Sequence, residues 1–181
     1  CLNYIRGSEE GNAYFFYNSV LSIAKIVKDL VSIFKCSPDD INIICANTEQ
    51  NVKILKRIDK KFYPRKAIEK DENGVAKPNI KKINFITSTS FEGQDFWDSY
   101  GRTYIVSDGK LDHTKLDIST QVSQIVGRLR DSKYKDNVTL IWTISPTLGF
   151  NILEEYSQYL EVQNEDSLMC ISVFDSVKSL N

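Results

Sequence analysis

The segment 13–34, "AYFFYNSVLSIAKIVKDLVSIF", contains the change of hydrophobic pattern that decides the fold class. Residues 12–19 form an aromatic run that ends in the polar pair Asn-Ser, which is typical of a buried strand. From residue 22 onward the apolar residues recur every three or four positions, which is the spacing of one helical face. That face is made by Ile23, Ile26, Val27, Leu30, Val31 and Phe34. The segment therefore predicts a buried strand followed directly by an amphipathic helix.

Strand and helix patterns continue to alternate along the chain. We expect further strands at 41–47, 82–89, 103–108 and 137–144, and helices at 49–58 and 119–131. Thr48 is expected to cap the first of these helices, and the Gly-, Pro- and charge-rich stretch 69–79 is expected to be a loop. The alternation predicts an α/β fold in which a mainly parallel sheet carries helices on both faces. Ligands of such sheets bind beyond the carboxyl ends of the strands.

Length and composition fit one domain with an ordinary core. The chain has 181 residues, of which 41% are apolar, and we expect a domain at 1–146 with a C-terminal helical extension at 147–181 packed on it. Its four cysteines are scattered, which predicts reduced thiols in a cytoplasmic protein and no metal site. Charged residues interrupt the most apolar long stretch, so no membrane role is expected.

Basic residues are concentrated in the middle of the chain. Residues 53–82, the basic block, hold eleven Lys and Arg against four acidic residues, whereas residues 83–181 hold eight against fourteen. Such a block can neutralise nucleic-acid phosphates. A solvated helix followed by a loop explains it equally well, and both interpretations stay open at this point.

Two later segments carry a more specific pattern. In "TSTSFEGQDF", residues 87–96, the residues Thr87, Gly93 and Asp95 stand at the spacing of motif V of the superfamily 2 helicases, which include the DEAD and DEAH types. In "QIVGRLRD", residues 124–131, the helix expected after the next strand resembles motif VI, Q-x-x-G-R-x-x-R. Gln124, Gly127 and Arg128 match that motif. Each motif alone is a weak signal, but both stand on the expected elements in the expected order.

Earlier elements agree with this resemblance. "FFYNSV" is similar to motif IV, with Asn18 and Ser19 at the end of its strand, and Gln50 and Lys53 are similar to a Q-x-x-R pair on the next helix of some branches. The resemblance covers roughly residues 12–144 and implies the C-terminal RecA-like domain of such a helicase, a three-layer sandwich of the P-loop NTPase type. The form of motif V also resembles helicase-like proteins of bacterial mobile elements or phages.

The resemblance implies a function shared between two lobes. This lobe would contact the backbone of DNA or RNA, with DNA favoured, and would supply arginines to ATP and Mg²⁺ bound mainly by an N-terminal RecA-like ATPase domain of the same protein. The whole protein would then be an NTP hydrolase. This lobe alone is not expected to hydrolyse ATP, because the chain contains no G-x-x-x-x-G-K-[ST] sequence to hold the β- and γ-phosphates.

The implied catalytic residues are arginines near a helix start. A planar guanidinium can bind two oxygens of the γ-phosphoryl group as charge develops there. The resemblance implies Arg128 as one such ligand. The family position for the second arginine holds Asp131, so we assign the role of arginine finger to Arg130. Gly127 permits close approach of backbone or phosphate, and Gln124 is expected to bond the triphosphate.

The remaining residues divide between the nucleotide and the nucleic acid. Gly93 and Asp95 are implied to face the nucleotide, and Asp95 would bind ribose or hold an arginine, although a simple capping role is also open. The residues implied to contact the nucleic-acid backbone are Asn18, Ser19, Gln50, Lys53, Thr87 and Ser88. Ser19 is equally well explained as a helix cap.

Two further expectations concern tryptophans and an alternative function. Trp97 and Tyr100 would stack on a base or pack in the core, and Trp142 is expected in the core. The alternative function is a non-catalytic nucleic-acid-binding RecA-like module without ATP coupling, which the displaced second arginine favours. A nucleotide-binding domain of another α/β class would require a glycine-rich first turn, and "YNSV" contains no glycine.

Overall fold

The computed structural model describes residues 1–70, 73, 75–91, 94–116 and 118–143, together with residues 158, 161, 162, 165, 168 and 169. The chain divides into two units, Cys1–Ile144 and Ser145–Asn181. The described residues of the second unit are helical. The boundary predicted at residue 146 lies outside the described residues, and the packing of the C-terminal extension stays a prediction.

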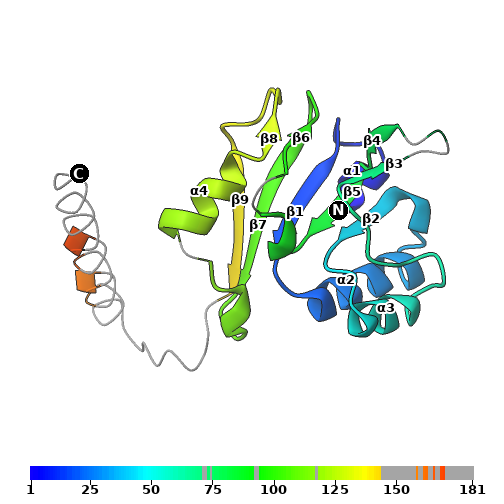
Figure 1. Cartoon of the computed structure of the whole chain (residues 1–181), viewed down its shortest axis with the longest axis horizontal. Helices are drawn as coiled ribbons and strands as arrows, with labels where there is room; N and C mark the ends of the chain where they lie inside the picture. The colour runs from blue at the N-terminus through cyan, green and yellow to red at the C-terminus, as the bar shows by residue number, and fades with distance from the viewer. Residues whose placement is uncertain are drawn as a thin grey trace. The chain divides into compact units, whose positions relative to one another are not determined.

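The first unit is built on a five-stranded sheet with the strand order β2-β5-β1-β7-β9 (Figure 1). Every neighbouring pair in this sheet is parallel. The strands are β1 (Ala13–Tyr17), β2 (Ile41–Ile44), β5 (Ile83–Ile86), β7 (Arg102–Asp108) and β9 (Val138–Thr143). The predicted α/β class with a mainly parallel sheet is confirmed. Because all strands run the same way, their carboxyl ends meet along one edge of the sheet.

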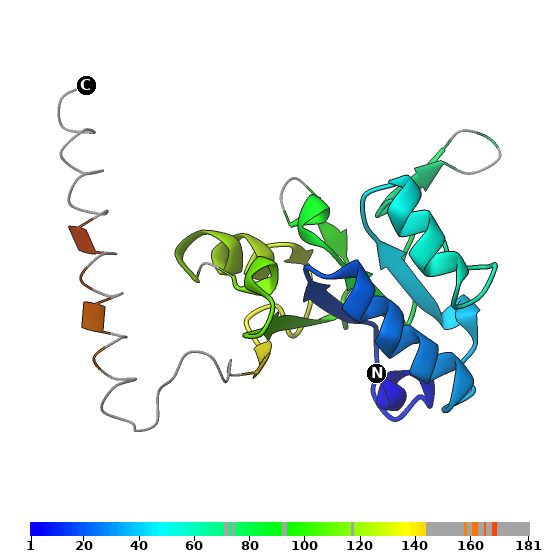
Figure 2. The same ribbon diagram turned by 90° about the horizontal axis from the view of Figure 1, so that it is seen from below.

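Two helices cover one face of the sheet and run side by side (Figure 2). Helix α2 (Val20–Ser32) buries Ile23, Val27 and Leu30, and helix α3 (Glu49–Lys56) buries Leu55 in the same core cluster. The Oγ1 of Thr48 accepts the Asn51 backbone N–H, so the predicted cap is confirmed. The short helix α1 (Leu2–Ile5) adds Tyr4 to this cluster.

The second face is covered by a mixed layer. A π-helical turn (Ile118–Val122) leads into helix α4 (Ser123–Val126), and strands β6 (Phe96–Trp97) and β8 (Leu129–Arg130) form a small parallel sheet. Phe96, Ile125 and Leu129 pack with Tyr14 and Phe16 of the central strand β1. The central strand is therefore buried on both faces, as its continuous aromatic run predicts.

The helix predicted at 119–131 is shorter than expected. Its α-helical part ends at Val126, and Gly127 is its C-cap. Leu129 then turns inward as part of β8 and is 3% exposed. The burial of this leucine and its pairing with β6 outweigh the helical spacing of the sequence, so Arg130 lies on a strand.

The stretch 69–79, predicted to be a loop, contains an antiparallel hairpin instead. Its strands are β3 (Ile68–Lys70) and β4 (Ala76–Pro78). The register pairs Lys70 with Ala76, so residues 71–75 connect the two strands. This connection contains Asn73 and Gly74, residue types that are common between strands.

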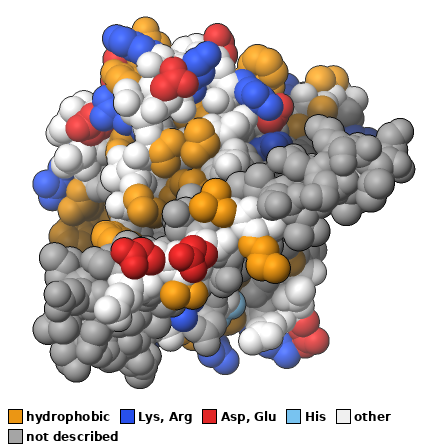
Figure 3. Space-filling model, turned by 90° about the vertical axis from the view of Figure 1, so that its left-hand side faces the viewer, with side chains coloured by type: hydrophobic (Ala, Val, Ile, Leu, Met, Phe, Trp, Pro, Cys, Tyr) orange, Lys and Arg blue, Asp and Glu red, His pale blue; other side chains and the backbone are white. Residues whose placement is uncertain are grey.

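The edge strand β9 corrects a second expectation. Trp142, predicted in the core, is 59% exposed, and Leu140 and Ile141 are exposed as well. Among the described residues, strand β9 pairs only with β7, and side chains on both of its faces are exposed. Exposed hydrophobic groups also stand among charged ones on the side shown in Figure 3. Within the described ranges, no helix has the length and apolar character needed to cross a membrane.

Candidate functional site

The segments that resemble motifs V and VI meet in the small sheet of β6 and β8. Phe96 pairs with Leu129 and Trp97 pairs with Arg130, and the backbone N–H of Phe96 donates a 2.8 Å hydrogen bond to the carbonyl oxygen of Arg128. Residues more than thirty positions apart are thus joined by backbone bonds. The pairing fixes the position of Asp95, which directly precedes β6, relative to the arginines around β8.

Asp95 lies between the two arginines. Its Oδ1 is 3.4 Å from Nη1 of Arg128, and its Oδ2 is 3.2 Å from Nε of Arg130. The Nε of Arg128 also donates a 2.9 Å hydrogen bond to the carbonyl oxygen of Gln124. We refer to Asp95, Gln124, Arg128 and Arg130 as the arginine cluster. Of the two roles predicted for Asp95, holding an arginine is the one visible here.

Local structure explains why cations gather at this point. The arginines follow the C-terminal end of α4, so the expected position near a helix start is wrong. A helix C-terminus carries partial negative charge and unpaired carbonyl groups, which arginine side chains satisfy. Two guanidinium groups share one carboxylate, and the side chain of Arg130 is 48% exposed. The cluster therefore retains net positive charge toward solvent.

Gly127 has room for a side chain within this protein. Its φ is −79°, and a β-carbon there would lie 3.7 Å from the nearest described atom, the carbonyl oxygen of Gln124. Neither backbone conformation nor internal packing requires glycine at this position. Gly93, the other glycine predicted for the nucleotide site, lies outside the described residues.

Trp97 extends the exposed surface beside the cluster. Its side chain is 67% exposed, so it does not pack in the core. Trp97 is the register partner of Arg130. Tyr100, in the following turn, is 41% exposed. The stacking role that the sequence left open for these two residues stays a prediction.

A second group of predicted residues meets at the carboxyl ends of the central strands. The Nδ2 of Asn18 donates a 2.8 Å hydrogen bond to the carbonyl oxygen of His113, and its Oδ1 accepts a 3.3 Å bond from the backbone N–H of Ser88. The Asn18 amide thereby ties together the loops that follow β1, β5 and β7. Its position at the strand ends agrees with the sequence, but its visible contacts are structural.

The residues beside Asn18 differ in what they expose. Thr87 is 4% exposed and its hydroxyl donates to the carbonyl oxygen of Ile44, so it does not present this group to solvent, contrary to expectation. Ser88 and Thr89 are exposed at the same edge. Ser19 is buried, and its Oγ accepts the Ser22 backbone N–H as the N-cap of α2. The capping interpretation of Ser19 therefore has direct support.

Gln50 and Lys53 lie in a separate place. Both line a groove of about 520 Å³ beside Leu21 and Ile54, and Lys53 forms an ion pair with Glu49. Helix α3 packs on the sheet face opposite to the one that carries the arginine cluster. The structure thus brings together the residues of motifs V and VI, but not the Gln50–Lys53 pair with them.

The reactivity of the Cys45 thiol reports whether solvent reaches it at the carboxyl end of β2. Burial raises the pKa of its thiol to about 11, so the thiol stays protonated at neutral pH. We expect iodoacetamide labelling of Cys45 to be slow at pH 8 and to rise about tenfold per pH unit up to pH 10. Peptide mass spectrometry measures this rate, with circular dichroism to verify folding. A plateau near pH 9 would show that the thiol is open to solvent.

No protein-family model, curated protein or solved structure matches this chain. The fold and geometry define the class of protein: an α/β domain with a parallel sheet, a partly exposed arginine cluster and polar loops at the strand ends. Within the described part of the chain, no three His, Cys, Asp or Glu side chains are grouped so as to hold a metal ion.

Proposed function

We propose that this chain is the C-terminal RecA-like lobe of an ATP-dependent DNA or RNA helicase or translocase. The observation that carries the proposal is the convergence of Arg128 and Arg130 on Asp95. Backbone pairing of β6 with β8 produces this geometry. The order of the motifs along the sequence supports the proposal separately. The turn after α4 and the strand β8 thus present two guanidinium groups from one layer.

The cluster suits a triphosphate that arrives from another lobe. The γ-phosphoryl oxygens carry more negative charge than Asp95, and planar guanidinium groups bind such oxygens in pairs. Asp95 keeps the two cations close together until an anion takes over part of its contacts. ATP and Mg²⁺ would be held mainly by the N-terminal lobe, because this chain supplies cations for the phosphates but contains no G-x-x-x-x-G-K-[ST] sequence.

The strand-end loops supply the nucleic-acid side of the proposal. Exposed hydroxyl groups of Ser88 and Thr89 are suited to hydrogen bonding with backbone phosphates, which positions a strand without reading its bases. The same short segment continues from Ser88 to Asp95. Because only seven positions of sequence separate Ser88 from Asp95, we expect movement at the strand-end loop to reach the arginine cluster. A cytoplasmic location remains part of the proposal.

The test is ATP hydrolysis by the protein that carries both lobes, measured with and without single-stranded DNA and RNA. We expect nucleic acid to stimulate the turnover rate, whereas this chain alone should hydrolyse no ATP. Absence of turnover under all these conditions would contradict the proposal. The preferred nucleic acid is the one, DNA or RNA, that stimulates ATP turnover at the lower concentration.

The Gly127→Ala variant tests whether a phosphate or the other lobe comes close to Gly127, because the substitution should leave folding unchanged. Because a β-carbon fits within the protein, we expect the free energy of unfolding to change by less than about 0.5 kcal/mol. Stimulated ATP hydrolysis should nevertheless fall at least about tenfold, since the new methyl group points where a phosphate or the other lobe approaches. Urea unfolding and turnover are measured on the same variant. Full activity would show that nothing comes close to Gly127.

A non-catalytic nucleic-acid-binding module is the second candidate. It is favoured by Asp131 at the position of the family's second arginine, and by the fact that both arginines already have a partner in Asp95. This candidate predicts nucleic-acid binding that is indifferent to ATP. Binding without any turnover in the two-lobe protein would select it.

A further inference from the structure

A pocket of about 890 Å³ lies at the carboxyl end of β2, between the β3–β4 hairpin and the loop that follows β5. We call it the hairpin pocket. Its size falls within the usual range of ligand sites. The residues of its lining that matter here are Tyr63, Arg65, Lys66, Lys70, Thr89 and Gln94. From the sequence, only the basic block is identified as a candidate binding region. The structure adds the hairpin and places part of the basic block in the wall of a pocket.

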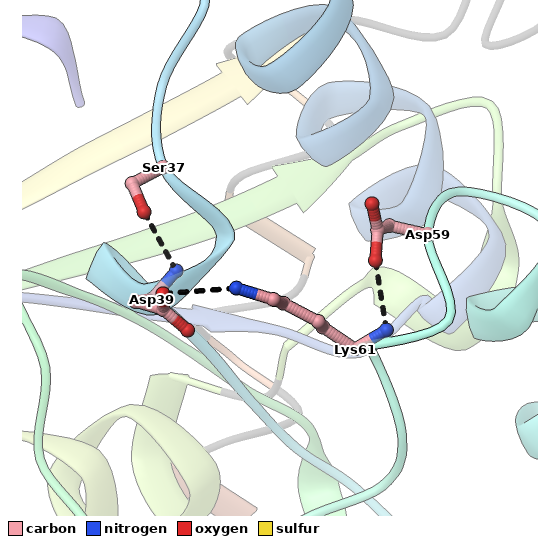
Figure 4. A network of polar contacts seen from close by, with 4 residues as sticks. All are labelled: Ser37, Asp39, Asp59 and Lys61. Carbon is pink, nitrogen blue, oxygen red and sulfur yellow. Dashed lines mark hydrogen bonds and ion pairs between the residues drawn. The ribbon is translucent and has the colours of Figure 1, made fainter.

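The segment that leads to the pocket has polar contacts of its own. Lys61 forms a 3.1 Å ion pair with Asp39, and its backbone N–H donates to Asp59 (Figure 4). Farther along the segment, the guanidinium of Arg65 lies 4.2 Å from the centre of the Tyr63 ring. The backbone N–H of Arg65 bonds the carbonyl oxygen of Ile43 in β2. Tyr63 and Arg65 thus form a preformed stacking pair.

The polar groups of the pocket are of three kinds, and one of them is the carboxylate of Glu69, whose Oε2 lies 3.6 Å from Nη1 of Arg65. Lys66 and Lys70 are exposed cations, whereas the opposite wall offers the exposed hydroxyl of Thr89 and the amide of Gln94. The Oε1 of Gln94 is buried and has no hydrogen-bond partner among the described residues. An unpaired buried acceptor is costly, and because less than 1 Å² of this atom is exposed, a ligand N–H reaches it only when the Gln94 amide turns toward the pocket.

We propose that the hairpin pocket binds one nucleotide of a single-stranded nucleic acid. The base stacks on the Tyr63–Arg65 pair and donates a ring or amino N–H to Gln94, while Lys66 and Lys70 bind its backbone phosphates. Aromatic and guanidinium planes with flanking cations are the usual means of binding unpaired strands. This inference rests on the proposed function, because Thr89 continues the strand-end loop assigned there to the nucleic acid.

The first test compares two pairs of lysines in the whole 181-residue chain. Binding of a fluorescein-labelled single-stranded DNA of mixed sequence is measured by anisotropy over a series of salt concentrations. K66A/K70A is expected to weaken binding about tenfold near 0.1 M salt and to reduce the salt slope by about 0.7 for each lost phosphate contact. K25A/K28A removes the same charge from exposed positions on α2 and should have a much smaller effect.

The second test separates stacking from charge. Tyr63→Leu is expected to weaken binding between about fivefold and 150-fold, because one base loses its stacking partner, without changing the salt slope. Phe34→Leu alters another exposed aromatic residue, at the end of α2, and should leave affinity unchanged. Circular dichroism confirms that each variant is folded.

The outcomes separate this inference from the proposed function. Equal losses for K66A/K70A and K25A/K28A, or no binding of the probe by the unaltered chain, would overturn the pocket assignment while leaving the ATP hydrolysis test independent. Pocket-dependent binding in a protein that never hydrolyses ATP would retain the pocket and reject the helicase proposal. A free mononucleotide that competes as well as the strand would also overturn it.

Discussion

Arg128→Ala is expected to lower nucleic-acid-stimulated ATP hydrolysis by the two-lobe protein about a thousandfold. Arginines that stabilise the transferred phosphoryl group contribute about 10³ to 10⁵ in rate in other phosphotransfer systems. In this chain the loss has two sources. The variant removes a guanidinium from the arginine cluster, and it leaves Asp95 with only Arg130 as a partner. ATP binding itself should change little, because the proposed function places most of the nucleotide contacts on the other lobe.

Arg130→Ala should lower turnover by a similar factor if Arg130 is the finger. Arg6→Ala, which removes an exposed arginine far along the chain from both motifs, is the matched control. Turnover is measured at saturating ATP and nucleic acid, and ATP affinity separately by equilibrium binding. Unchanged turnover for both cluster variants would show that the cluster is structural. Loss for Arg128→Ala alone would leave Arg130 without the assigned role.

Gly11→Ala is expected to destabilise the fold by about 3 kcal/mol or more. Gly11 has φ +82°, and a β-carbon there would lie 2.1 Å from the carbonyl oxygen of Tyr100. The turn that carries Tyr100 cannot yield, because Asp98 accepts hydrogen bonds from Asn12 at 2.8 Å and from the buried hydroxyl of Tyr14 at 2.9 Å. Both the backbone conformation and the clash oppose the variant.

Gly7→Ala is the matched control for this effect. Gly7 also has a positive φ, of 73°, but no described atom lies within 4 Å of the position its β-carbon would take. The free energy of unfolding of that variant should fall by only about 1 kcal/mol, which is the conformational cost of a positive φ for alanine. Urea unfolding measures both. A difference below about 0.5 kcal/mol between the two variants would show that the Tyr100 turn does not rest on Gly11.

Much of the central sheet can be predicted from local patterns. The aromatic run of β1 is buried on both faces of the sheet, so its apolar character is continuous. The three-to-four spacing identifies Ile23, Val27 and Leu30 on the buried side of α2. Ile26 and Phe34, expected on the same side, are 37% and 47% exposed. Thr48 and Ser19 act as caps within short segments. These features depend on neighbours in the sequence, which is why periodicity identifies them.

The candidate site is only partly predictable, because its geometry depends on distant pairing. Arg128 and Arg130 stand out as a motif, but their approach to Asp95 follows from the pairing of β6 with β8, whose two-residue strands leave no periodic signal. The burial of Thr87 and the exposure of Trp142 likewise depend on where their strands lie in the sheet. A residue pattern cannot distinguish an edge strand from a central one.

The hairpin pocket could not be predicted from the sequence, for a related reason. In the sequence, Lys66 and Lys70 are members of a charged stretch, and only the folded chain brings them to the same pocket as Thr89 and Gln94. These two pairs of residues are 19 to 28 positions apart in the sequence. No local signal connects them.

The most direct test of the central claim is an experimental structure of the two-lobe protein with a non-hydrolysable ATP analogue and Mg²⁺. We predict guanidinium nitrogens of Arg128 and Arg130 at about 2.7–2.9 Å from oxygens of the γ-phosphate, with at least one contact to Asp95 released. Both arginines still bound to Asp95 and turned away from the nucleotide would contradict the account.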